Sequence, residues 1–177
     1  TDIIEEPIDS ELNEEQIKQE LNKVNKKIIK ITSDDIQKCK LLFTLFGIPY
    51  ISSNGEAEDL CSQLCKEKIV YGCLSEDTDI LANGGCIFIR DFNSNNNNVT
   101  EYNLNNILSG LKLTYDEFVD MCILCGCDYT CKIPGIGPVN AYKYIIDHKS
   151  IDNIIDCINN NSIKKYNIPE KFEYQKA

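Results

Sequence analysis

The chain has no tryptophan, one arginine and one methionine among its 177 residues. It also lacks any apolar run that approaches the length of a membrane-spanning helix, which is about 20 residues. No succession of charged, apolar and small residues marks a signal peptide at the N-terminus. These absences argue against a membrane protein. Because the sequence starts at Thr1 and not at methionine, we expect a piece of a longer protein or a processed product.

Positive charge is scarce as well, since the formal net charge is −10. Proteins that bind duplex DNA usually neutralise phosphates with Lys and Arg, so this balance alone argues against a nucleic-acid partner. Carboxylates that hold divalent cations, however, count as negative in the sum and are neutralised in use. The cations are also unevenly placed: Arg90 is the only arginine, and four lysines cluster at Lys23, Lys26, Lys27 and Lys30.

Cysteine, by contrast, is abundant, with ten residues. Four of them form C-x2-C-x-C-x3-C at Cys122, Cys125, Cys127 and Cys131. Structural zinc sites usually combine one close pair with a second pair a dozen or more residues away, whereas these four fall within ten residues. We therefore interpret them as small apolar residues of a reducing compartment and expect an intracellular protein, in the nucleus or alternatively the cytoplasm.

Hydrophobic periodicity predicts an α/β fold with a mainly parallel sheet, because helices and strands alternate, and a helical last third from about residue 114. The expected helices span residues 12–28, 33–46, 55–68, 115–125, 140–148 and 151–158. The expected strands span residues 49–52, 69–75, 86–92 and 99–102. The second helix should stop at Gly47, and its expected inward residues are Ile36, Cys39, Leu42, Phe43 and Phe46.

Acidic residues follow the expected strand at 69–75, in the stretch LSEDTDIL with Glu76, Asp77 and Asp79. Ligands bind outside the carboxyl ends of strands in open α/β sheets. In an extended chain the i, i+2 spacing turns Asp77 and Asp79 to one face, where they suit a hard divalent cation. The alternative is that Asp77 only caps a short helix at residues 78–82. Capping needs one acid and the stretch has three, which favours the metal site.

Glu56 and Glu58 form a second candidate pair, but residues i and i+2 point well apart on a helix. They can serve one site only near the helix start, where side chains fan around the end. The alternative is an acid-rich first turn that complements the helix dipole. Asp128, just after the expected helix at 115–125, is by itself a common helix-exit residue, and near the two pairs it would add a fifth oxygen ligand.

Two glycines occur in the turn IPGIGP, residues 133–138, which precedes a helix. Gly135 and Gly137 let the backbone approach a partner closely, and Pro138 suits the first helical position. Free backbone N–H groups at such a helix start can bind a phosphate, although an ordinary helix–helix turn fits equally well. Carboxylate-held metals beside a phosphate-binding turn indicate phosphodiester chemistry.

Four stretches together resemble the flap endonuclease family of structure-specific 5′ nucleases: LFGIPYISSNGEAEDLCSQL, LSEDTDIL, FVDMCILCGCDY and IPGIGPVNAYKYIIDHKSI. Their order and spacing match as well as their letters, over roughly residues 20 to 160. NKKIIKITSDDIQKCK also resembles the segment that leaves the family's helical arch. The resemblance implies a PIN-like α/β 5′-nuclease core with a helix-two-turn-helix element. It divides the chain into an arch-exit segment (1–32), a nuclease core (33–113) and a helical part (114–177).

The resemblance also implies the site: its catalytic, metal-binding carboxylates are Glu56, Glu58, Asp77, Asp79 and Asp128. Two Mg²⁺ ions, with Mn²⁺ as a substitute, would neutralise these acids. The protein would then be a two-metal hydrolase that acts in DNA replication and repair. Backbone carbonyls of Lys132, Ile133 and Ile136 would bind K⁺. Gly135, Gly137 and Lys143 would contact branched or flap DNA.

The sequence also departs from the family pattern. The family adds two upstream aspartates and a basic arch, so we expect an N-terminal half, in the same or another chain, as a partner. Relatives carry a basic pair where this chain has Val139-Asn140, and Lys143, Lys149, Lys164 and Lys165 would compensate. No sliding-clamp-binding motif is present in this chain. The alternative function is a catalytically incomplete DNA-structure-binding module. A haloacid-dehalogenase-type phosphatase fits poorly, because Leu81 stands where that motif has Thr or Val.

Overall fold

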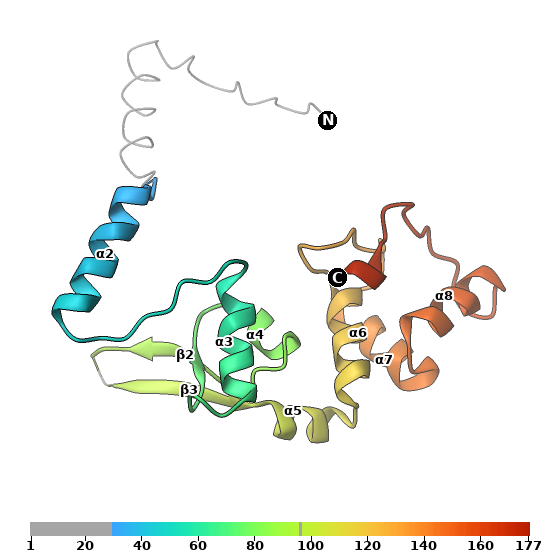
Figure 1. The fold of residues 1–177 in the computed structure, drawn as a ribbon. Coiled ribbons are helices and arrows are strands. Elements are labelled where there is room, and N and C mark those ends of the chain that lie inside the picture. The colour runs from blue at the N-terminus through green and yellow to red at the C-terminus, as the bar shows by residue number, and fades with distance from the viewer. Residues whose placement is uncertain (1–29, 96) are drawn as a thin grey trace, which may run out of the picture. The chain divides into compact units, whose positions relative to one another are not determined.

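The structure is a computed structural model that describes residues 30–95 and 97–177 (Figure 1). Its contacts divide the chain into two units, one up to Ser52 and one from Ser53 to Ala177. The helix predicted over residues 12–28 and most of the lysine cluster lie outside the described residues. The boundaries predicted from the family resemblance, after residues 32 and 113, stay predictions.

The first unit contains the helix α2, Ser33–Leu45, which begins where the sequence predicts. Thr32 caps it, because its Oγ1 accepts from the Asp35 N–H at 3.3 Å and Asp35 Oδ2 accepts from the Thr32 N–H at 2.9 Å. Gly47, in the left-handed region with φ of 67°, follows the helix end. The start and stop signals of this helix are therefore encoded locally.

Two expectations for this unit are wrong. No residue of α2 is buried, and neither is its C-cap residue Phe46, because a helix cannot bury its own apolar face and its unit offers no second described element. The expected inward set, Ile36, Cys39, Leu42, Phe43 and Phe46, is therefore wrong. Residues 49–52 do not form a strand, since the described residues provide no neighbour to pair with and Pro49 has no N–H to donate.

The second unit contains a sheet of three strands in the order β1–β2–β3, with β1 at Cys73–Leu74, β2 at Ile87–Asn93 and β3 at Asn98–Asn103. β1 pairs parallel with β2, whereas β2 pairs antiparallel with β3. The described sheet is thus mixed and not mainly parallel, because a connection of only a few residues joins β2 to β3 and such a connection allows only a hairpin. The strand expected over 69–75 is also shorter, and only Cys73 and Leu74 pair in the ladder.

Six α-helices complete the described part of the second unit: α3 (Ala57–Lys66), α4 (Asp79–Ala82), α5 (Leu104–Leu111), α6 (Tyr115–Cys125), α7 (Pro138–His148) and α8 (Ile151–Asn159), followed by the 3₁₀ turn η1 (Tyr174–Lys176). The sequence analysis missed α5. Its signals are an asparagine cap, since Asn103 Oδ1 accepts from the Asn106 N–H at 3.2 Å, and apolar residues at helical spacing. Among the described residues, no helix is both long and apolar enough to cross a membrane.

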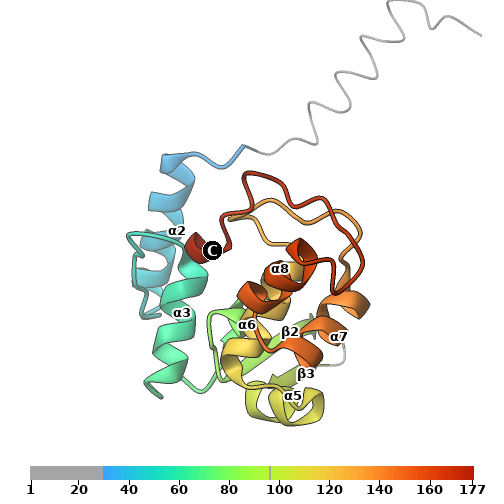
Figure 2. The ribbon, with the colours of Figure 1, turned by 90° about the vertical axis from the view of Figure 1, so that its right-hand side faces the viewer.

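Two hydrophobic clusters form the core of the second unit. The larger one joins α5, α6, α7, α8 and the C-terminal segment, and both views show α6, α7 and α8 side by side (Figure 2). The smaller one consists of Cys65, Cys73, Ile80 and Phe88, and it holds α3 and α4 against the sheet. These two clusters fix the start of α3, the start of α4 and the end of α6, which carry the predicted site residues.

Candidate functional site

One cavity of about 150 Å³ in the second unit is lined by all five predicted carboxylates and one further side chain, Tyr129. The acids come from three separate segments. Two stand at the start of α3, two at the start of α4, and one follows α6: Glu56, Glu58, Asp77, Asp79 and Asp128. We call this the acidic cavity. Residues up to 72 positions apart in the sequence thus line one cavity.

Glu56 and Glu58 lie at the start of α3, which is the one place on a helix where residues at this spacing can serve one site. Glu56 is the N-cap residue, extended with φ of −63° and ψ of 137°, and the helix proper begins at Ala57. Its backbone C=O accepts from Ser53 Oγ at 3.1 Å. Because Glu56 lies before the first helical turn and Glu58 within it, their side chains fan around the helix end and both reach the acidic cavity.

The stretch LSEDTDIL is held by a series of short-range hydrogen bonds. The Ser75 N–H donates to the Ile89 carbonyl at 3.0 Å, which continues the pairing with β2. The Asp77 N–H donates to Ser75 Oγ at 3.0 Å, and Asp77 Oδ1 accepts from the Asp79 N–H at 3.0 Å. The N-cap residue of α4 is Thr78, and Asp77 before it accepts from the first N–H of the helix while it also lines the acidic cavity, so the two interpretations of Asp77 are compatible.

Glu76, the third acid of the stretch, faces β2 instead. Its Oε1 accepts from the Asp91 N–H at 3.1 Å, and its Oε2 lies 3.4 Å from Arg90 Nη2. Asp91 has φ of 57° beside an irregularity in the β2–β3 register, which turns its N–H toward Glu76. The charge of Glu76 is thus balanced by Arg90, whereas Asp77 and Asp79 form no ion pair with any described residue.

The five carboxylates of the acidic cavity place several negative charges close together. Partial burial, followed by the charges of Asp77, Asp128 and Glu58, raises the pKa of Asp79. A divalent cation with oxygen ligands would relieve this repulsion, so the donor set fits Mg²⁺ or Mn²⁺. Among the described residues, no three acid, thiol or imidazole groups already stand close enough to share one ion.

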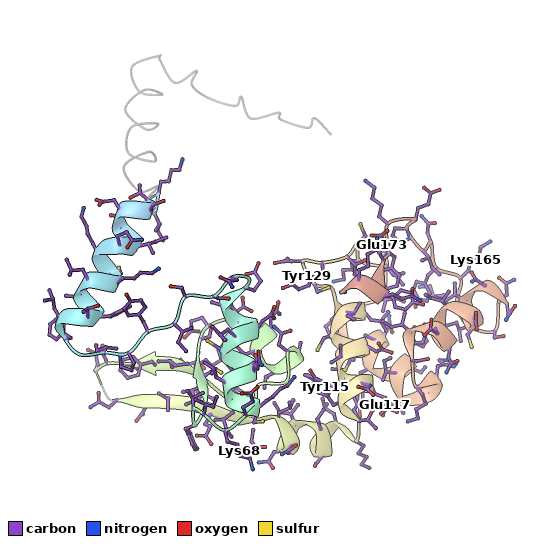
Figure 3. All side chains as sticks on the ribbon, in the orientation of Figure 1. Lys68, Tyr115, Glu117, Tyr129, Lys165 and Glu173 are labelled. Atoms are coloured by element: carbon purple, nitrogen blue, oxygen red, sulfur yellow. The ribbon has the colours of Figure 1, made fainter. Side chains whose placement is uncertain are left out.

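A larger cavity of about 680 Å³ adjoins the acidic cavity and shares Asp79 and Tyr129 with it. Its walls come from α3, α4 and α6, and the Tyr115 hydroxyl bridges two of them by donating to the Ala82 carbonyl at 2.6 Å. Tyr129 lies on the loop after α6 (Figure 3). Desolvation and then the nearby acids, Glu56 first, raise the pKa of its phenol, which stays neutral. Sequence reasoning missed Tyr129, although its place directly after Asp128 was a usable signal.

The glycine turn lies between α6 and α7. Gly135 has φ of 88°, so a residue with a side chain would be strained there, while Gly137 is extended with φ of −116° and caps α7. Pro138 occupies the first turn of α7, as predicted. Asn140 donates from Nδ2 to the Gly135 carbonyl at 3.1 Å and closes the turn.

The carbonyls expected to bind K⁺ belong to this turn. Ile133 and Ile136 are buried, and the Ile133 carbonyl accepts from the Ile136 N–H at 3.2 Å, which leaves it a second lone pair. Binding of K⁺ by Lys132, Ile133 and Ile136 stays a prediction, as do DNA contacts of Gly135, Gly137 and Lys143. The four clustered cysteines are free thiols, and burial raises the pKa of Cys122 to about 12, so this thiol is protonated at neutral pH.

Residues 47–128 match the XPG I-region family model, and this range includes all five acids of the acidic cavity. This part of the chain, from the end of the first unit to the residue that follows α6 in the acidic cavity, is therefore an XPG I-region. The chain is 40% identical over 171 residues to flap endonuclease 1 of Glycine max, with 95% of this chain and 44% of the relative covered. It is 39% identical over 161 residues to flap endonuclease 1-B of Physcomitrium patens, covering 89% of this chain and 45% of the relative.

Solved structures agree with the sequence relatives. The catalytic core of Rad2 in complex with a DNA substrate matches with a TM-score of 0.70 and 31% identity, over 82% of this chain and 46% of that one. The Holliday junction-resolving enzyme GEN1 in complex with product DNA and Mg²⁺ matches with a TM-score of 0.65 and 26% identity, over 81% and 40%. A GEN-1 structure with potassium matches with a TM-score of 0.63 and 26% identity, over 80% and 42%.

The chain belongs to the flap endonuclease family and matches its internal and C-terminal nuclease region. It spans less than half the length of these curated relatives.

Proposed function

We propose that this chain is the metal-binding part of a structure-specific 5′ nuclease that hydrolyses phosphodiester bonds in branched DNA during replication and repair. The observation that carries the proposal is the convergence of five carboxylates from three segments on one cavity. Homology to flap endonucleases, to Rad2 with a DNA substrate and to GEN1 with product DNA and Mg²⁺ supports it.

Each part of the site has a chemical task in this proposal. Glu56, Glu58, Asp77, Asp79 and Asp128 would hold two Mg²⁺ ions, or Mn²⁺. When bound, such ions activate a water and stabilise the leaving oxygen. The hydrogen bonds from Ser75 to Asp79 hold that stretch in place before an ion binds, which lowers the entropy cost of ordering it.

The helices α6 and α7 with the turn between them would form a helix-two-turn-helix element on a PIN-like core. K⁺ held by the carbonyls of Lys132, Ile133 and Ile136 would bridge to a DNA phosphate, and Gly135, Gly137 and Lys143 would lie along the same backbone. Phosphate contacts fix the position of a duplex without reading bases. This part of the site should therefore select the structure of the DNA and not its sequence.

Full activity should also require a partner segment. The family pattern includes two upstream aspartates, and within the described residues β1 pairs with β2 alone, with Leu74 63% exposed. We infer that an N-terminal half, in the same or a separate chain, completes the sheet and the metal site. A protein that acts on replicating DNA would reside in the nucleus.

The test compares two acids of one stretch, Asp79→Asn and Glu76→Gln, in the full protein. Asp79 lines the acidic cavity, whereas Glu76 is bound to Asp91 and Arg90, so Glu76→Gln is the matched control. Cleavage of flap, gapped and four-way-junction DNA is measured in Mg²⁺, both for the full protein and for this chain without the N-terminal half. We expect Asp79→Asn to lower cleavage at least about 100-fold and Glu76→Gln to change it only a few-fold.

DNA affinity, measured in Ca²⁺ to prevent cleavage, should stay within a few-fold for both variants. Near-normal cleavage by Asp79→Asn would overturn the assignment of the acids. Tight binding of branched DNA without cleavage, even with the N-terminal half added, would instead establish the alternative of a DNA-structure-binding module.

A further inference from the structure

Tyr129 stands out among the residues of the acidic cavity because it is the one lining side chain that is not an acid. It is 55% exposed, and its hydroxyl makes no hydrogen bond to any residue that the structure describes. It follows Asp128 directly, so its backbone is fixed by the same loop that places a carboxylate. A large ring is thus presented to solvent beside the carboxylates, without a partner in the described chain.

The position of this ring between two cavities indicates which part of a substrate it can reach. Tyr129 and Asp79 line both the acidic cavity and the adjoining cavity of about 680 Å³. Pockets of about 300–1,000 Å³ are typical of sites for small organic groups. A phosphate drawn to ions in the acidic cavity would therefore have its neighbouring nucleoside within reach of the shared wall that Tyr129 forms.

The chemistry of the surroundings restricts what the ring can contact. Its neighbours in the acidic cavity are hydrogen-bond acceptors that repel phosphate oxygens unless cations intervene. The ring is a flat, neutral face, and every nucleobase has a π-face that stacks on an aromatic side chain regardless of sequence. Resting on the function proposed above, we propose that Tyr129 binds the substrate by stacking on the unpaired nucleobase next to the phosphate that is cut.

The experiment is a cycle between the protein and the substrate. The affinity of the full protein for flap DNA is measured in Ca²⁺, with either a normal base or an abasic residue beside the scissile phosphate. The variants are Tyr129→Leu, which removes the ring, and Tyr129→Phe, which keeps it. Tyr71→Leu is the matched control, since Tyr71 is exposed, bonds through its hydroxyl to Glu101 and lines neither cavity.

Stacking predicts that Tyr129→Leu weakens binding of normal DNA about 5- to 100-fold and hardly affects abasic DNA. Tyr129→Phe and Tyr71→Leu should bind both substrates like the parent protein. Equal losses on normal and abasic DNA, or a loss with Tyr129→Phe, would overturn the proposal. If Tyr129→Leu does not fold, unchanged affinity of the parent protein for abasic DNA is sufficient to overturn it.

This outcome is separable from the proposed function. Fluorescence of 2-aminopurine at the same position should be quenched on binding by the parent protein and by Asp79→Asn, but not by Tyr129→Leu. Failure of the metal assignment would show as normal cleavage by Asp79→Asn, whereas failure of stacking would show as quenching that survives Tyr129→Leu.

Discussion

The ring of Tyr166 lies 3.3 Å from the position that a β-carbon would occupy on Gly135. Tyr166 is buried, and its hydroxyl lies 2.9 Å from that of Tyr144 on α7. The C-terminal segment therefore packs directly against the glycine turn and ties it to the following helix. The turn owes its shape to this contact as well as to its own sequence.

Gly135→Ala should destabilise the second unit by about 1–3 kcal/mol, because it places a β-carbon at φ of 88° and against the Tyr166 ring. Urea denaturation followed by circular dichroism measures the change. Gly137→Ser is the matched control, since Gly137 is extended, has open space at its β-carbon position and occupies an N-cap position that favours serine. A loss of stability in Gly137→Ser equal to that in Gly135→Ala would contradict this account of the turn.

Tyr166→Phe should lower the pKa of Tyr144, which its hydrogen bond with the Tyr166 hydroxyl and then partial burial raise to about 12. The folded protein keeps this proton more tightly than the unfolded chain does. The stability from the pair should therefore be complete below about pH 10 and be lost as the pH rises toward about 12. Absorbance at 295 nm during alkaline titration measures the phenolate. An unchanged titration curve in Tyr166→Phe would show that the two hydroxyls are not coupled.

Neutralising one acid of the cavity should stabilise the protein in EDTA. Asp79→Asn removes a carboxylate whose pKa is raised by burial and by three acidic neighbours. After solvent screening, its removal should increase the free energy of unfolding by about 0.5–1 kcal/mol, or the Tm by about 1–4 °C. In Mg²⁺ the order should reverse, because saturating metal stabilises only a protein that binds it, by about 2.7 kcal/mol at 100 times Kd. Differential scanning fluorimetry in both buffers measures this crossover.

Glu76→Gln provides the control for this experiment, because Glu76 already has Asp91 and Arg90 as partners. Its Tm in EDTA should not rise, and its response to Mg²⁺ should equal that of the parent protein. A Tm for Asp79→Asn below the parent value in EDTA would show that the carboxylates do not repel one another in the folded state.

The cysteines should differ in reactivity according to burial. Burial and then the neighbouring Cys65 raise the pKa of Cys73 to about 12, whereas Cys61 and Cys131 are exposed. Only thiolates react with iodoacetamide. Mass spectrometry after alkylation at pH 8 should find Cys131 modified quickly and Cys73 protected until denaturant is added. Modification of both at one rate would mean that the smaller hydrophobic cluster opens readily.

Helix boundaries were the part of the fold most open to prediction, because their signals are local. α2 begins at Ser33 and is followed by Gly47, and α6 ends before Gly126, as the sequence indicated. Pro138 lies in the first turn of α7 as expected, although the predicted helix span began only at residue 140. Strands were less predictable because a strand needs a partner. Residues 49–52 have an apolar composition and no pairing strand among the described residues, and the antiparallel direction of β3 follows from its short connection to β2.

The site shows the same division between local and distant causes. The family resemblance selected the five acids, but spacing could not decide on Glu56, because a shift of one residue in the start of α3 would move it into the helix. Nor could spacing separate Glu76 from Asp77. That choice depends on the N–H of Asp91, which an irregularity in a different strand turns outward.

The hydrogen bonds along LSEDTDIL also make that stretch intolerant of inserted or deleted residues. Ser75, Asp77 and Asp79 each donate a backbone N–H to a partner set by residue count, so an inserted residue would break these bonds and swing Asp79 out of the acidic cavity. The asparagine-rich connection between β2 and β3 lines neither cavity. Peptide tags or reporter domains should therefore be accepted in that connection and rejected between Ser75 and Asp79.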